Sequence, residues 1–114
     1  MEKYGIRFPD NVIEIDAVGY LEFLYLLKNC DLVLTDSGGV TEEAIILKKP
    51  CITLRHSTAR WETILLKANT LFPLDRNDSL GTVISEMLQT KIVCNPYGTN
   101  VTEKTLNLVN KIVR

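Results

Sequence analysis

Short apolar runs that alternate with helix-like patterns constrain the fold of this chain more than any other feature. The apolar runs lie at residues 12–15, 32–34, 51–54 and 69–72. The helix-like patterns lie at residues 20–28, 40–48, 62–67, 79–90 and 102–113. Parallel strands need long crossover connections, and helices supply them, so the alternation predicts a parallel sheet. With right-handed crossovers, we expect the α/β fold class: a Rossmann-like parallel sheet with helices on both faces.

Composition excludes several classes of protein. The 114 residues suit one domain, and 46% of them are hydrophobic, which is enough to build a core. No apolar stretch reaches the ~20 residues that a membrane-spanning helix needs. The net charge is −1 and no cluster of Lys and Arg is present, so nucleic-acid binding is not expected. Residues 1–7 have the pattern of a helix end, with a stop at Tyr4-Gly5 and no apolar signal core, and we expect a cytoplasmic protein.

The cysteines predict neither a metal site nor a redox site. Cys30, Cys51 and Cys94 are odd in number, far apart in the sequence and without metal-ligand spacing. We therefore expect reduced, mostly buried thiols. No metal and no other cofactor is expected.

The segment Thr35-Asp36-Ser37-Gly38-Gly39 joins an apolar run to a helical pattern. A strand, a small-residue turn and a helix start can hold a phosphate, because glycine lets the backbone approach a ligand closely. The free N–H groups at the start of the helix then point at the anion. Ser37, Gly38 and Gly39 are thus a candidate diphosphate cradle. An ordinary turn with Asp36 or Ser37 as helix N-cap explains the same spacing.

Two glutamates, Glu42 and Glu43, follow the cradle in the expected helix. A carboxylate one turn into the helix can reach past a phosphate to a ribose hydroxyl, as acids do in dinucleotide-binding folds. The segment has neither the Gly-Lys-Ser/Thr of an ATP-hydrolysing loop nor Gly-x-Gly-x-x-Gly. The pattern therefore argues against an ATPase and against a conventional NAD site.

Two polar segments, residues 36–39 and 55–60, directly follow expected strands. The carboxyl ends of parallel strands meet at one edge of the sheet, where ligands bind, so both segments are expected at that edge. Arg60 lies in the second segment, where its guanidinium could clamp a phosphate through two hydrogen bonds. Arg55, at a strand end, is a weaker candidate. A solvated loop arginine is the alternative for Arg60.

Taken in order, the motifs resemble those of the non-hydrolysing UDP-N-acetylglucosamine 2-epimerases. The matching segments are Gly19-Tyr20-Leu21-Glu22-Phe23, Thr35 to Ala44, Lys49-Pro50-Cys51 with Arg55, Thr58-x-Arg60-x-Glu62-Thr63 and Asn95-Pro96-Tyr97-Gly98. The resemblance covers nearly the whole chain. It implies the C-terminal, UDP-binding domain of a two-domain, glycosyltransferase-B-like fold. The loop from His56 to Trp61 departs from the usual pattern of the family, so its role stays open.

The resemblance also implies roles for single residues. The Ser37–Gly39 cradle would hold the UDP phosphates, Glu43 would bind the ribose hydroxyls, and Phe23 would lie near the uracil. Arg60 matches the arginine of the family's Thr-x-Arg-x-Glu segment. From the sequence alone, a Phe among apolar helical neighbours is more often part of the core. His56 does not match the position of the family's catalytic histidine, and we expect it to be a loop residue.

The resemblance implies that no catalytic residue lies in this chain. Family members interconvert UDP-GlcNAc and UDP-ManNAc by eliminating UDP and adding it back. Their catalytic carboxylates and histidine have no counterpart here, so the isolated chain is expected to be inactive and to need an N-terminal epimerase domain as partner. A homodimer is possible. Two alternatives stay open: a stand-alone nucleotide-binding regulatory module, and one half of a related glycosyltransferase.

Overall fold

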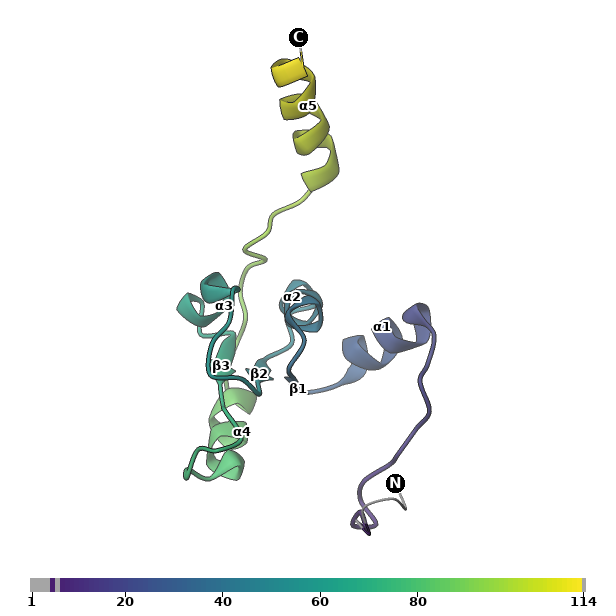
Figure 1. Ribbon diagram of the computed structural model, residues 1–114, viewed down its shortest axis with the longest axis vertical. Coiled ribbons are helices and arrows are strands. Elements are labelled where there is room, and N and C mark those ends of the chain that lie inside the picture. Colours follow the sequence, from purple (N-terminus) through teal and green to yellow (C-terminus); the bar gives the residue numbers. More distant parts are fainter. Residues whose placement is uncertain (1–4, 6, 114) are drawn as a thin grey trace.

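The structure, a computed structural model, describes residue 5 and residues 7–113. Its elements in chain order are α1 (Tyr20–Asn29), β1 (Val33–Thr35), α2 (Gly38–Ile46), β2 (Cys51–Thr53), α3 (Trp61–Leu65), β3 (Asn69–Leu71), α4 (Leu80–Leu88) and α5 (Val101–Val113). Figure 1 shows them as a central body with two extended ends. The helix end expected at Tyr4-Gly5 lies outside the described residues, apart from the turn at Gly5.

The three strands form one parallel sheet in the order β1-β2-β3. In register, Val33 lies opposite Cys51, and Cys51 lies opposite Asn69. Because neighbouring strands run in the same direction, α2 and α3 are crossover helices. All three strands therefore end at the same edge of the sheet, as the sequence predicted.

Helices cover both faces of the sheet, which confirms the predicted fold class. Successive side chains of a strand point to opposite faces. Cys51 packs in a cluster with Leu27 of α1 and with Ala44 and Ile45 of α2. Its neighbour Ile52 packs in a second cluster on the other face with Phe72, Val83 and Met87. The two clusters are the two halves of the core, and they hold the helix starts in place at the edge of the sheet.

The prediction of a strand at residues 12–15 is wrong. These residues form no strand, and Ile13 and Ile15 are 85% and 58% exposed. The segment runs away from β1 in Figure 1. Alternating apolar residues indicate that one face of a segment suits burial, but a strand also needs a neighbour to bond with. Within the part of the chain that the structure describes, no strand pairs with the outer side of β1, so β1 is an edge strand of the sheet.

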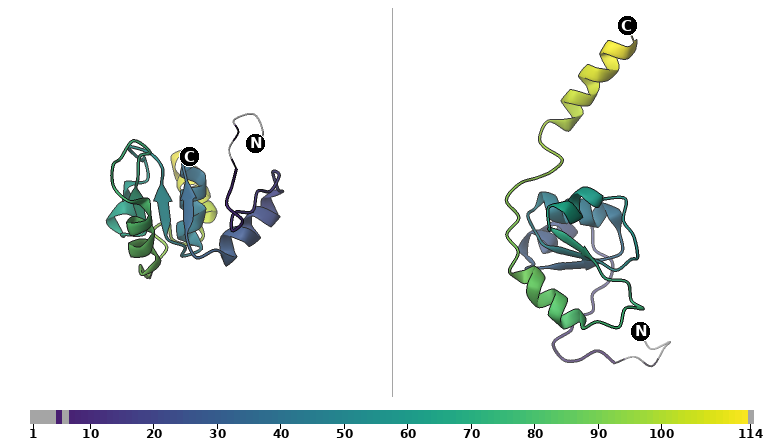
Figure 2. Two further views of the ribbon diagram at one scale, coloured as in Figure 1. Left: turned by 90° about the horizontal axis from the view of Figure 1, so that it is seen from below. Right: turned by 90° about the vertical axis from the view of Figure 1, so that its left-hand side faces the viewer.

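Helix α5 stands apart from the body of the molecule, as the right-hand view of Figure 2 shows. It contains no buried residue, although Leu106, Leu108 and Ile112 are large and apolar. The radius of gyration is 17.2 Å, whereas a compact chain of this length has about 13 Å. The described helices include none with the length and apolar character needed to cross a bilayer.

Candidate functional site

The site begins where β1 ends and α2 starts. Ser37 is the N-cap of α2, and its hydroxyl oxygen accepts a hydrogen bond from the amide of Val40 at 3.4 Å. The Thr35 hydroxyl oxygen accepts from the amide of Ser37 at 3.1 Å. The next two amides, those of Gly38 and Gly39, stand in the first turn, where a helix offers no backbone acceptor. Amides in this position can bind an anion, and the cradle stays a prediction.

A polar cavity of about 290 Å³ lies beside this helix start. Gly38 forms one wall, and the loop from Arg55 to Arg60 forms the other. Asp36 and Thr53 also line it, at the ends of the first and second strands. The parallel topology thus brings together the two polar segments that the sequence placed at one edge. Two arginines and a helix N-terminus suit a bound anion, and Asp36 opposes it.

Gly38 leaves room in this cavity. An ideal Cβ built on Gly38 meets no heavy atom within 4 Å. Its backbone is not in the left-handed region, where the described glycines are Gly5 and Gly98. The conformation of the backbone therefore does not require glycine at this position. The absence of a side chain instead keeps the cavity wall open.

Arg60 is a paired residue and not the freely solvated loop arginine of the alternative interpretation. Its Nε lies against the carboxylate of Glu42 on α2, and 35% of each side chain is exposed. The pairing is an ion pair only, because Nε is buried without an acceptor in hydrogen-bonding geometry among the described residues. The sequence pattern did not identify Glu42 as the partner of Arg60.

Glu43 points to the other side of α2. Its carboxylate accepts a hydrogen bond from the Tyr20 hydroxyl of α1 at 2.9 Å. This bond raises the pKa of Tyr20 above its ordinary value, since loss of the proton would break the bond and bring two negative charges together. Glu43 and Tyr20 line an apolar groove of about 470 Å³ between α1 and α2. Because adjacent helical residues differ by ~100°, Glu42 and Glu43 serve different sides of the helix.

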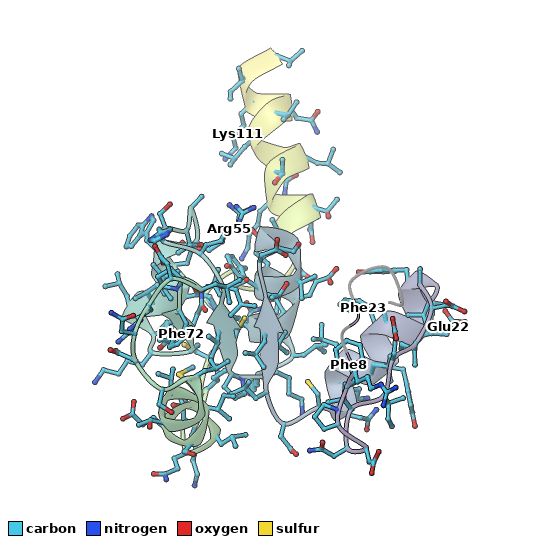
Figure 3. All side chains as sticks on the ribbon, turned by 60° about the horizontal axis from the view of Figure 1, so that its bottom comes forward. Phe8, Glu22, Phe23, Arg55, Phe72 and Lys111 are labelled. Atoms are coloured by element: carbon cyan, nitrogen blue, oxygen red, sulfur yellow. The ribbon has the colours of Figure 1, made fainter. Side chains whose placement is uncertain are left out.

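Phe23 lies on α1 and is half-buried against the core cluster that contains Leu27 and Ala44. Figure 3 shows Phe23 on α1 and Arg55 on the far side of α2. The structure therefore brings Gly38 and Arg60 together at the polar cavity, with Ser37 and Gly39 beside them in the chain. Glu43 faces α1, and Phe23 lies on α1 itself. A ligand that contacts all of these residues must pass over the start of α2.

Two further polar pairs lie near the site. The Tyr97 hydroxyl donates to the carboxylate of Glu62 at 2.9 Å. The pKa of Tyr97 is raised, mainly because the hydroxyl is partly buried and also because of this hydrogen bond. The pair joins the segment before α5 to the start of α3. His56 lies 3.2 Å from the carboxylate of Asp75, and both side chains are mostly exposed. His56 is thus a surface loop residue, as expected.

The cysteines follow the prediction only in part. All three are free thiols, but Cys51 alone is buried, Cys30 is half-buried and Cys94 is exposed. The expectation of mostly buried thiols is therefore wrong for Cys94. Burial raises the pKa of the Cys51 thiol, and hydrogen bonds to Thr41 and Thr53 oppose this effect.

Known proteins of similar sequence are named as 2-epimerases of UDP-sugars. The sequence profile of the family described as UDP-N-acetylglucosamine 2-epimerase matches residues 1–109. A UDP-N-acetylglucosamine 2-epimerase of Methanocaldococcus jannaschii is 54% identical over 85 residues, which are 74% of this chain and 23% of that protein. A UDP-2,3-diacetamido-2,3-dideoxy-D-glucuronate 2-epimerase of Pseudomonas aeruginosa is 46% identical over 71 residues, 62% of this chain and 20% of that protein.

A solved structure agrees with these matches. The crystal structure of the M. jannaschii UDP-GlcNAc 2-epimerase in complex with UDP-GlcNAc and UDP has a TM-score of 0.76 to this structure, at 47% identity. The match covers 85% of this chain and 27% of that one. The chain spans about a quarter of the length of such relatives. Since the family profile covers nearly all of the sequence, the chain belongs to the UDP-N-acetylglucosamine 2-epimerase family.

Proposed function

We propose that this chain is the C-terminal, UDP-binding part of an epimerase that interconverts UDP-GlcNAc and UDP-ManNAc. The observation that carries the proposal is the polar cavity between the start of α2 and the loop that holds Arg55 and Arg60. A helix N-terminus and two guanidinium groups together suit a diphosphate. The crystal structure of the M. jannaschii relative, a complex with UDP-GlcNAc and UDP, supports this ligand.

In this proposal, UDP lies across the start of α2. The amides of Gly38 and Gly39, the Ser37 hydroxyl and Arg60 hold the diphosphate. The ribose hydroxyls donate to Glu43 on the other side of the helix, in place of the Tyr20 hydroxyl that Glu43 now binds. The base then lies toward α1, near Phe23.

The chemistry belongs to the rest of the protein in this proposal. Elimination and re-addition of UDP at the sugar need acid and base groups beside the sugar ring, and we assign none to this chain. The relatives are about three times as long, and we propose that an N-terminal domain supplies these groups. We also propose that the protein forms a homodimer. We further propose a cytoplasmic location, which agrees with the three free cysteines.

Calorimetric titration of the 114-residue chain with UDP tests the proposal. We expect weak binding, because one side of the site is open, and a further loss in Ser37→Ala and Glu43→Ala. Ser85→Ala is a matched control, because the Ser85 hydroxyl bonds only to Gly81 within α4. A folded chain that fails to bind UDP would overturn the proposal. Turnover of UDP-GlcNAc by the chain alone would refute the assignment of catalysis to the N-terminal domain.

A further inference from the structure

Four polar side chains lie inside the core, between the sheet and helices α2 and α3. Thr41 and Thr63 are 0% exposed, Asn69 is 1% exposed and Thr53 is 2% exposed. Buried polar groups cost free energy unless they are hydrogen-bonded, so this cluster needs internal partners. None of the four is among the residues to which we assign contact with UDP.

The four side chains form two arms that end at the two loops of the proposed site. On one arm, the Thr41 hydroxyl donates to the carbonyl oxygen of Ser37 at 3.0 Å. On the other, the Thr53 hydroxyl donates to Asn69 Oδ1 at 2.9 Å. Asn69 Nδ2 donates to the Thr63 hydroxyl at 3.1 Å, and Thr63 donates to the carbonyl oxygen of Arg60 at 2.6 Å.

The arms meet where the hydroxyl oxygens of Thr41 and Thr53 lie 3.4 Å apart. A hydroxyl has one proton, and the bonds to Ser37 and Asn69 already use those of Thr41 and Thr53. The contact between the arms is therefore the longest and loosest part. Each of the other bonds has a fixed donor and acceptor, so the arms hold their loops with defined geometry.

The two ends of the cluster are the two backbone positions that frame the polar cavity. Ser37 precedes Gly38, whose open side forms one wall of the cavity, and Arg60 forms the other wall. The carbonyl of Arg60 also accepts from the amide of Thr63 at 3.0 Å, which makes Arg60 the N-cap of α3. Displacement of either carbonyl would change the distance between the helix start and the arginine.

We infer that Thr41, Thr53, Asn69 and Thr63 are positioning residues for nucleotide binding, which set the cradle and Arg60 at the spacing of a diphosphate. This inference rests on the proposed function. It predicts that loss of the hydroxyl of Thr41 or Thr63, neither of which lines the cavity, weakens UDP binding. It also predicts that removal of the Thr63 hydroxyl lowers the affinity for UDP by displacing Arg60.

The test compares three variants of the 114-residue chain by calorimetric titration with UDP at a temperature where all are folded. Thr63→Val replaces the hydroxyl with a methyl group of similar size and should weaken binding by about threefold or more, as expected for one lost hydrogen bond. Thr63→Ser keeps the hydroxyl and should restore the affinity. Thr70→Val is the matched control, because the Thr70 hydroxyl donates to Met87 Sδ at 3.3 Å and not to either loop.

A second background separates positioning from a general loss of stability. With Arg60 replaced by Ala, Thr63→Val should cause no further loss of affinity, because its route of action has been removed. An equal loss in both backgrounds would overturn the inference. If Thr63→Val does not fold, Thr41→Val tests the other arm, and affinity equal to that of Thr70→Val would overturn the inference in the same way.

The outcomes distinguish this inference from the proposed function. If the unmodified chain binds UDP and the Thr63 and Thr41 variants bind it equally well, the inference fails and the proposed function stands. If the folded, unmodified chain does not bind UDP, the proposed function fails and the inference falls with it.

Discussion

At the scale of single residues, two features shape the proposed site: a glycine in the cavity wall and an ion pair beside it. Gly38 keeps the cavity wall open, although its backbone conformation would accept another residue. Arg60 is already held by Glu42 before any ligand arrives. Both features can be changed by small substitutions that leave the core untouched.

Gly38→Ala should weaken UDP binding and leave the fold intact. The added methyl group meets no protein atom within 4 Å, but it enters the cavity in which we place the diphosphate. Crowding of this kind costs ~1–3 kcal/mol, which corresponds to about 5- to 150-fold in affinity. Calorimetric titration measures the loss of affinity, and thermal melting followed by circular dichroism checks the fold.

The control for this variant is Gly81→Ala. Gly81 also lies in the first turn of a helix after a serine N-cap, and its added methyl group would contact the Ser79 hydroxyl oxygen at 3.6 Å. Gly81 does not line the polar cavity. Equal affinities of the two variants for UDP would contradict our placement of the diphosphate.

Glu42→Gln should strengthen UDP binding. The Glu42 carboxylate competes with phosphate for Arg60 and also repels it. An ion pair of this exposure is worth ~0.2–1 kcal/mol, so we expect a gain of at most about fivefold. Titration of Glu42→Gln beside Glu86→Gln, which removes the same charge from an exposed position on α4, isolates the local effect. Weaker binding would instead mean that Glu42 holds Arg60 in its binding position.

At the scale of elements, the periodicity of apolar residues predicted the helices and strands that pack on or in the sheet. The helices and strands from α1 to α5 begin and end within two residues of the sequence predictions, because a periodic pattern reports which face of an element is buried. The prediction of a strand at residues 12–15 was wrong because alternating apolar residues show which face of a segment suits burial, but not whether another strand is present to pair with it. The edge position of the cradle and of Arg60 was predictable, since it follows from parallel topology alone.

The partners of the site residues were not predictable in the same way. Glu42 with Arg60, and Tyr20 with Glu43, join elements whose relative position no local pattern reports. The buried cluster around Asn69 depends on side chains from four elements that meet only after folding. A Thr in an apolar strand is also explained by simple β-propensity, so a role in a buried hydrogen-bonded cluster could not be predicted for it.

Helix α5 offers a test at this scale. Truncation after Gly98 removes α5 and keeps the bond between Tyr97 and Glu62. Because α5 contains no buried residue, the free energy of unfolding should change by no more than ~0.5 kcal/mol. Chemical denaturation of the truncated and full chains measures the difference. A loss of several times this size would mean that α5 packs on the body in solution.

At the scale of the whole molecule, the chain leaves apolar surfaces uncovered. The groove between α1 and α2 exposes Leu21 and Tyr25, and α5 exposes Leu108 and Ile112. Apolar patches of this kind mark surfaces that contact another protein or domain. This agrees with a chain that spans about a quarter of the length of its relatives. The polar cavity at the start of α2, in contrast, is formed entirely within this chain.

The central claim is that the start of α2 and Arg60 hold the diphosphate of a UDP-sugar. A titration of the isotope-labelled chain with UDP, followed by amide NMR, tests it most directly. We predict that the amides of Gly38 and Gly39 and the side-chain Nε–H of Arg60 show the largest shifts, and that inorganic phosphate at high concentration moves the same signals. Saturable binding of UDP that leaves these three signals in place would contradict the account.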